Sequence, residues 1–120
     1  MEKFDFILTD DNSVGLYDKS VEDILHSRSG ALKESYEKFI LPSHLTQLLK
    51  KEKNINILDI CFGVGYNTKS ALNFVDSSNI NIDAVEINQT LMYLSLFIKD
   101  GLNDNVQKMF LFYQLLNQGL

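Results

Sequence analysis

A glycine-containing segment in the middle of the chain carries the clearest chemical signal. It reads DICFGVGYN over residues 59–67 and separates a branched apolar run from a helical pattern. Two glycines let the backbone turn sharply and approach a ligand, and the helix that follows offers N–H groups and a positive dipole end. Thr68 stands where the dinucleotide fingerprint has its third glycine, so pyrophosphate binding is disfavoured. Asp59, four residues before Gly63, is more typical of nucleoside-binding loops that hold an amino-acid head group.

An acidic residue lies at the expected distance beyond this loop. Glu86 ends a second apolar run, 21 residues after Gly65. A carboxylate at such a strand end accepts hydrogen bonds from both hydroxyls of a ribose, as in dinucleotide-binding folds. The loop and the acid together are more specific than either alone. The alternative interpretation is a tight glycine turn with a solvated carboxylate at a strand end.

Four further residues invite a chemical interpretation. His26 and Arg28 lie in a polar loop; a lone loop histidine more often makes a structural hydrogen bond, whereas a guanidinium binds a carboxylate or phosphate through two hydrogen bonds. Cys61 has no histidine near it in sequence to lower its pKa, so a packing role is favoured over a nucleophilic one. His44 belongs to an amphipathic segment, and a structural role is expected.

Periodicity and turn residues predict the elements that position these groups. A β-hairpin is expected from two short β-prone runs, and a helical turn from the segment after it. The polar loop 26–31 then leads into helices that Pro42 separates. In chain order the expected elements are strands 4–9 and 14–17, a helical turn at 20–26, helices 31–41 and 44–51, a buried strand 55–60, a helix 67–75, a strand 80–87 and a helix 88–101. The inward apolar positions of the first two helices are Leu32, Tyr36, Phe39, Ile40, Leu45, Leu48 and Leu49.

From residue 55 onward the order is strand, glycine loop, helix, strand, helix, which is typical of a right-handed βαβ crossover in a parallel sheet. The fold class is therefore α/β: a partial Rossmann-like fold with an N-terminal β-hairpin and helices. We expect residues 1–54 to form the hairpin and helical extension, and 55–120 the first half of a Rossmann-like domain. The strongly apolar segment 103–119 is expected to be helical and to require a partner surface.

Composition narrows the function classes. The 120 residues make one domain, and the single cysteine excludes a disulfide scaffold and a multi-cysteine zinc site. No apolar stretch approaches the ~20 residues that cross a bilayer, and no signal peptide is evident, so we expect a cytoplasmic protein without membrane association. The net charge of −5 disfavours tight nucleic-acid binding unless basic residues form a patch. The residues that would have to form it are Arg28, Lys33, Lys38, Lys50, Lys51 and Lys53.

The glycine loop, together with Leu16-Tyr17 and the segment HSRSGALKES over residues 26–35, resembles the methyltransferase domain of the MnmC family. This family synthesises 5-methylaminomethyl-2-thiouridine in tRNA. The resemblance covers about residues 4–90 and implies a class I Rossmann-like fold that binds S-adenosylmethionine and methylates the aminomethyl group of the wobble uridine. It implies cofactor contacts from Asp59, Phe62, Gly63, Gly65, Asn67 and Glu86, with Glu86 on the ribose. It also implies that His26, Arg28, Ser29 and Gly30 form a loop near cofactor or substrate.

One departure from the family pattern matters. Family members continue through further strands to an acidic, aromatic and proline-containing motif, whose aspartate receives the substrate amine. The 120 residues end before such a motif. We therefore expect a truncated member that binds tRNA weakly alone and self-associates or pairs with a complementary chain. The alternatives are a non-catalytic remnant or interaction module that at most binds the cofactor, and an NAD-dependent oxidoreductase, which would need the missing glycine.

Overall fold

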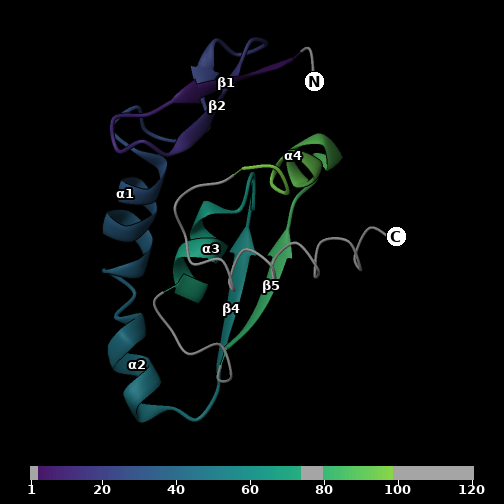
Figure 1. Ribbon diagram of the computed structural model, residues 1–120. Helices are drawn as coiled ribbons and strands as arrows, with labels where there is room; N and C mark the ends of the chain where they lie inside the picture. Colours follow the sequence, from purple (N-terminus) through teal and green to yellow (C-terminus); the bar gives the residue numbers. More distant parts are fainter. Residues whose placement is uncertain (1–2, 74–79, 99–120) are drawn as a thin grey trace.

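The computed structural model describes residues 3–73 and 80–98 (Figure 1). It confirms a mixed α/β architecture with an N-terminal hairpin and a parallel strand pair. The elements in chain order are β1 (Phe4–Leu8), β2 (Val14–Asp18), β3 (Asp23–Ile24), α1 (Ala31–Ser35), the π-helical turn η1 (Tyr36–Ile40), α2 (Leu45–Lys51), β4 (Ile55–Ile60), α3 (Tyr66–Asn73), β5 (Ile80–Val85) and α4 (Gln89–Leu94).

The predicted hairpin is confirmed, but the predicted helical turn at 20–26 is wrong. Strands β1 and β2 pair antiparallel, and β3 adds to β2 as a third strand. The Asp18 carboxylate accepts hydrogen bonds from both the N–H and the hydroxyl of Ser20, and Glu22 has a φ of 56°. This side-chain turn and the left-handed residue reverse the chain, so it returns to the sheet instead of winding into a helix.

A column of helices follows, formed by α1, η1 and α2 (Figure 1). Ile40 and Leu45 are buried as expected. Tyr36, Phe39 and Leu48 were expected to face inward, but they are 38%, 49% and 41% exposed. The π-helical turn at 36–40 has more residues per turn than an α-helix, so the 3.6-residue spacing does not carry through it.

Strands β4 and β5 form the parallel pair, in register from Ile55 opposite Ile80 to Ile60 opposite Val85. One face of the pair packs against the helices. This hydrophobic cluster contains Ile40, Leu45, Leu49, Ile55, Ile57, Ala71, Ile80 and Ile82. The opposite face presents Leu58, Ile60 and Val85, which are more than half exposed. Among residues 3–73 and 80–98, only one face of strand 55–60 is covered, which corrects its description as buried for this part of the chain.

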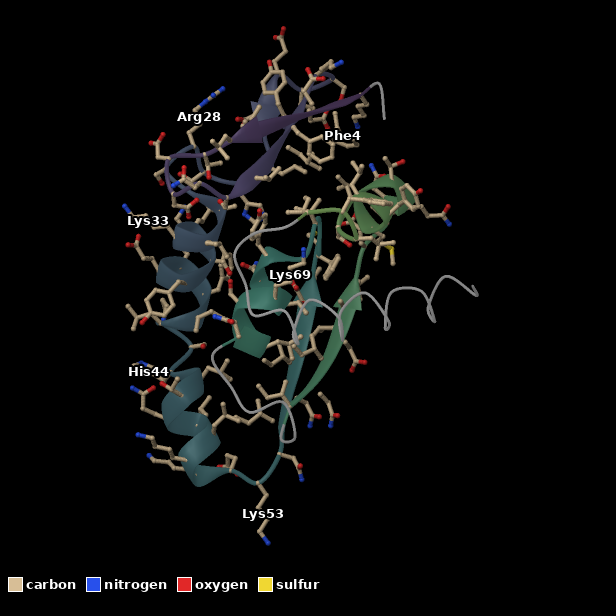
Figure 2. All side chains as sticks on the ribbon, viewed as in Figure 1. Phe4, Arg28, Lys33, His44, Lys53 and Lys69 are labelled. Carbon is tan, nitrogen blue, oxygen red and sulfur yellow. The ribbon has the colours of Figure 1, made fainter. Side chains whose placement is uncertain are left out.

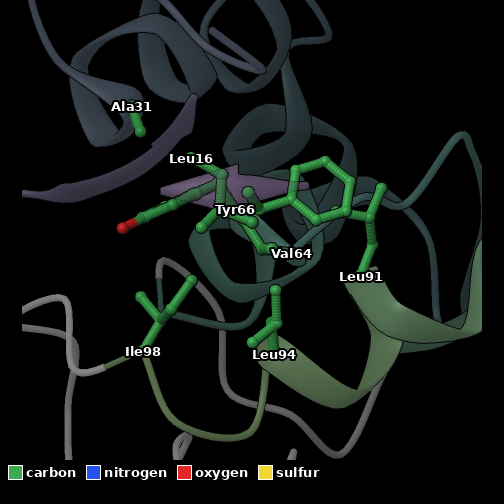
Figure 3. Packing of buried hydrophobic residues seen from close by; sticks show 8 residues of the cluster. Leu16, Ala31, Val64, Tyr66, Leu91, Leu94 and Ile98 are labelled. Carbon is green, nitrogen blue, oxygen red and sulfur yellow. The ribbon is translucent and has the colours of Figure 1, made fainter. Parts of the chain in front are cut away.

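A second hydrophobic cluster joins the N-terminal sheet to the loop after β4 and to α4 (Figure 3). Its members are Phe4, Leu16, Ala31, Val64, Tyr66, Leu91, Leu94 and Ile98. The predicted cap of α4 is confirmed, because Asn88 Oδ1 accepts the N–H of Thr90 at 2.9 Å. The cluster contains residues from both of the predicted units, 1–54 and 55–120. The division into these two units stays a prediction. The predicted apolar helix at 103–119 lies outside the described residues.

Candidate functional site

The glycine loop is a tight turn between β4 and α3. Cys61, Gly63 and Gly65 all have positive φ, at 61°, 62° and 88°. The N–H of Phe62 donates to Val85 O at 3.0 Å, and the N–H of Gly65 donates to Phe62 O at 3.0 Å. These bonds fix the loop against the end of β5. A Cβ added at Gly63 would meet no atom closer than Cys61 O, at 3.9 Å, so the backbone there is open to a close approach.

Glu86 is joined directly to this loop. Its Oε2 accepts the N–H of Gly63 at 2.7 Å, and its Oε1 accepts the N–H of Asn88 at 2.8 Å. The carboxylate therefore bridges the glycine loop and the start of α4. A carboxylate has about four lone-pair sites, so two acceptor positions remain for a ligand. Ile87, the next residue, is 98% exposed and gives the same edge an apolar surface.

Two polar side chains behind the loop have different environments. Asp59 is buried and accepts the hydroxyl of Thr68 at 2.5 Å. Thr68, at the position of the missing third glycine, thus holds the end of β4 to α3. The Oδ1 atom of Asn67 is buried and has no hydrogen-bond partner among the described residues. A buried acceptor without a partner costs about 1–3 kcal/mol, which a bound donor would recover.

Tyr66 connects the loop to the N-terminal part of the chain. Its side chain is fully buried, its hydroxyl donates to Val14 O at 2.5 Å, and its carbonyl accepts the hydroxyl of Ser35 at 3.2 Å. The His26 ring meets the Tyr66 ring edge to face, with centroids 5.2 Å apart. The structure therefore brings the loop that contains His26 beside the glycine loop.

The other residues of that loop have separate roles. Glu34 organises it by accepting the Ser27 N–H at 2.9 Å, with His26 Nδ1 3.4 Å away. Arg28 is exposed, and Ser29 is exposed and bonds only to Ser27 within the described residues. A shallow pocket, wide open to solvent and with a volume of about 520 Å³, lies between the loop, β3 and the helices. It is lined by Asp23, Ile24, Leu25, His26, Ser27, Arg28, Glu34 and Lys38.

Gly30 faces the hairpin turn, an arrangement that the sequence analysis missed. Asp11 lies against it and accepts the N–H of Lys33 at 2.9 Å, while Ser13 Oγ accepts the N–H of Ala31 at 2.9 Å. The hairpin turn thus caps the start of α1 across 18 to 22 residues of sequence. Burial raises the pKa of Asp11, but hydrogen bonds from Ser13, Lys33 and Thr9 outweigh it and hold this pKa at about 2. The T-x-D-x-S pattern at 9–13 was the available signal.

Several other expectations can now be compared with the structure. Cys61 is exposed, which corrects the expected packing role; its left-handed conformation follows the strand end and keeps it outside the core. His44 starts α2 with a φ of 54°. Within residues 3–73 and 80–98, no three metal-ligating side chains gather and no helix is long and apolar enough to cross a membrane.

Known proteins share parts of this sequence and fold. The chain superimposes, along 90% of its length, on the crystal structure of MnmC2 from Aquifex aeolicus, with a TM-score of 0.69 and 25% sequence identity. The fold is similar to that of MnmC2. The chain is also 38% identical, over 97 residues, to an uncharacterized protein of Methanocaldococcus jannaschii. No family model matches the sequence.

These likenesses extend over only part of each relative. The chain covers 36% of the MnmC2 chain and 26% of the Methanocaldococcus protein, although 90% and 81% of the chain itself are matched. The match to MnmC2 leaves only about a tenth of this chain outside it. An MnmC-like relationship is therefore supported for the described elements.

Proposed function

We propose that this chain is the cofactor-binding part of an MnmC-type methyltransferase with a class I Rossmann-like fold. It binds S-adenosylmethionine at the glycine loop and serves the methylation of the aminomethyl group of the tRNA wobble uridine, in the cytoplasm. One observation carries the proposal: Glu86 at the end of β5 bonds to the Gly63 N–H. The acid and the loop, 23 residues apart, are thus parts of one site beside parallel strand ends.

The residues present fit this cofactor. The open backbone at Gly63 admits a ligand. The Asn67 Oδ1, which has no partner in the part of the chain that the structure describes, suits a donor such as the amino group of the methionine moiety. The remaining acceptor positions of Glu86 suit two ribose hydroxyls, and the exposed Ile87 suits the face of an adenine ring. When bound, S-adenosylmethionine supplies an electrophilic methyl group.

The chain's own residues hold and orient that ligand. Glu86 fixes the ribose while keeping the glycine loop in place, and the Asp59–Thr68 bond fixes the end of β4 against α3. His26 contacts Tyr66 beside the glycine loop, and His26 and Arg28 line the same hollow, which supports the proposal that the 26–30 loop faces the substrate. The resemblance assigns the amine-binding aspartate to a later motif, so cofactor binding is the role proposed for these residues.

Isothermal titration calorimetry with S-adenosylmethionine, S-adenosylhomocysteine and NAD tests the cofactor assignment. We expect both sulfur-containing ligands to bind and NAD to bind more weakly, because Thr68 replaces the third glycine. Glu86→Gln should weaken binding tenfold or more, since a charged acceptor makes the stronger hydrogen bonds. Glu37→Gln, on the exposed surface of η1, is the matched control. Tighter binding of NAD would overturn the assignment.

A second candidate is a non-catalytic module that binds the cofactor without transferring its methyl group. The groups of the described site favour it, because the Glu86 carboxylate and the Asn67 Oδ1 are suited to holding a ligand. A radiolabelled methyl-transfer assay on undermodified tRNA separates the two candidates. Turnover that Glu86→Gln reduces supports the enzyme, whereas cofactor binding without turnover supports the module.

A further inference from the structure

Charge is distributed unevenly along the chain. Residues 25–54 hold six of the eleven Lys and Arg residues but only three of the sixteen acidic ones. This quarter of the chain therefore carries a net charge of +3, and the remainder carries −8. A protein with net charge −5 thus has a basic segment, which the overall charge conceals.

The fold places this segment on one side of the molecule. It forms the 25–30 loop and the column of α1, η1 and α2. Figure 2 shows Lys33 and His44 on the outer side of that column, Arg28 on the loop at one end of it beside the N-terminal sheet, and Lys53 in the turn at the other end. We call the exposed basic residues of this loop, the column and the turn after it the basic face. Its members, all exposed, are Arg28, Lys33, Lys38, Lys50, Lys51 and Lys53. Of these six residues, only Lys38 forms an ion pair with another described residue, Glu34, at 3.5 Å.

Aromatic side chains and a pocket accompany these charges. Tyr36 and Phe39 of η1 are 38% and 49% exposed, although the sequence pattern placed them in the core. At the loop end of the column, Arg28 and Lys38 line the 520 Å³ pocket, together with His26 and the acids Asp23 and Glu34. His26 also contacts Tyr66 at the glycine loop. The basic face therefore runs from the candidate site along the helices.

We propose that the basic face binds RNA, with the lysines on phosphates, Phe39 and Tyr36 stacking on unpaired bases, and the pocket receiving a nucleotide. Basic charge interleaved with aromatic rings is the pattern of single-strand recognition, because rings stack on any base and cations neutralise phosphates. An anionic membrane or an acidic protein surface would use the charges but would not require rings beside a nucleoside site. That the RNA is tRNA rests on the proposed function; the face itself does not.

Fluorescence anisotropy with a labelled, undermodified tRNA at 50–200 mM salt tests the face. The variant Lys33→Gln/Lys51→Gln removes two charges from it, and Lys3→Gln/Lys19→Gln removes two from the N-terminal sheet as the matched control. We expect the first pair to weaken binding about tenfold and to lower the slope of log K against log salt by about 1 to 2. The control should change affinity less than twofold.

Phe39→Ala separates stacking from charge. It should weaken binding of an anticodon-loop oligonucleotide several-fold while leaving duplex RNA unaffected, with Phe6→Ala on β1, 56% exposed, as control. Three results would overturn the proposal. The first is an equal loss of RNA affinity in the two lysine double variants, and the second is no RNA binding at 50 mM salt. The third is binding of phosphatidylserine vesicles that RNA does not displace. Calorimetry with S-adenosylmethionine on the parent and on Lys33→Gln/Lys51→Gln keeps this proposal distinct from the cofactor assignment. A variant that binds S-adenosylmethionine as the parent does, but RNA more weakly, supports the face. A parent that binds RNA without binding S-adenosylmethionine also supports the face and contradicts only the proposed function.

Discussion

Two glycine-containing loops of this protein each lead into a helix, and they are completed differently. The loop before α1 ends at Gly30, where the Asp11 carboxylate occupies the helix start and accepts the Lys33 N–H. The loop before α3 ends at Gly65, and α3 has no acidic residue in its first turn. There the Asp59 carboxylate accepts the hydroxyl of Thr68, and the Glu86 carboxylate accepts the N–H of Gly63, two residues before the end of the loop. The Oδ1 of Asn67 has no partner among the described residues.

The difference shows how one backbone device serves structure in one place and binding in another. A helix N-terminus attracts an anion, and a carboxylate from the same chain satisfies that preference permanently. The loop before α3 instead has open backbone at Gly63, the Glu86 carboxylate beside it, and an Asn67 acceptor without a partner among the described residues. These features stabilise the fold less, but they leave groups that can bind a ligand. We call the two loop–helix boundaries the α1 junction and the α3 junction. Mutations at the α1 junction are expected to lower stability, and mutations at the α3 junction are expected to weaken ligand binding.

Alanine substitution of Gly30 and of Gly63 should give the largest difference in stability between the two junctions. At Gly30, with φ 147°, an added Cβ would lie 2.1 Å from the Asp11 carboxylate, whereas at Gly63, with φ 62°, it would meet only Cys61 O at 3.9 Å. We expect Gly30→Ala to lower the free energy of unfolding by about 3 kcal/mol and Gly63→Ala by about 1 kcal/mol. Urea denaturation measures both values.

Ligand affinity should show the reverse order. Gly63→Ala should weaken S-adenosylmethionine binding about tenfold, because the backbone no longer admits close approach, and folded Gly30→Ala should bind nearly as the parent. Equal effects of the two substitutions on both quantities would show that the junctions are not functionally different.

Removal of the internal anion should have the next largest effect. Asp11→Ala deletes the acceptor of the Lys33 N–H and of the Thr9 and Ser13 hydroxyls. Loss of a helix cap costs about 1–2 kcal/mol, so thermal unfolding should shift down by several degrees. The neighbouring Asp10→Ala is the control, because Asp10 is exposed and only its backbone N–H bonds to the loop, at Arg28 O. A similar shift for both variants would contradict the capping role.

The two junctions also differ in how far sequence could predict them. The strand, glycine loop, helix and acid follow local spacing, so Gly63 and Glu86 could be found by counting residues. The Asp11 cap joins residues 22 apart, and no periodicity encodes which turn will reach which helix. The π-helical turn likewise moved Phe39 to the surface. The six basic residues that could form a patch were named from the sequence, but their arrangement along one helical column depends on the fold. Sequence predicted what is local and missed what tertiary packing brings together.

The contact between the hairpin and the glycine loop includes the hydroxyl of Tyr66, which a single substitution removes. Tyr66→Phe removes the hydroxyl that donates to Val14 O and leaves the ring against His26. A buried hydrogen bond contributes about 1 kcal/mol, and the Val14 carbonyl loses this donor, so we expect a loss of about 1 kcal/mol in urea denaturation. Tyr93→Phe, on a ring that is 45% exposed, should be neutral. An unchanged stability for Tyr66→Phe would mean that the ring alone joins the hairpin to the glycine loop.

The smallest expected effect is the pH dependence of the α1 junction. The pKa of Asp11 is lowered from 3.8 to about 2, so its ionised form is favoured by folding. Its stabilisation is therefore complete above pH 3.8 and is lost as the pH falls through 2. Asp11 is partly exposed, and solvent screening reduces the contribution to about 1 kcal/mol.

The test compares parent and Asp11→Asn in urea at pH 5 and pH 2. The carboxyl of Asp18 also has a lowered pKa, through the Ser20 hydroxyl, but it titrates in both proteins and cancels in the difference. We expect the parent's advantage of about 1 kcal/mol at pH 5 to shrink between pH 4 and pH 2, because the protonated Asp11 no longer accepts charge-assisted hydrogen bonds from the start of α1. A difference that stays constant over this range would show that shape, and not the negative charge, completes the helix.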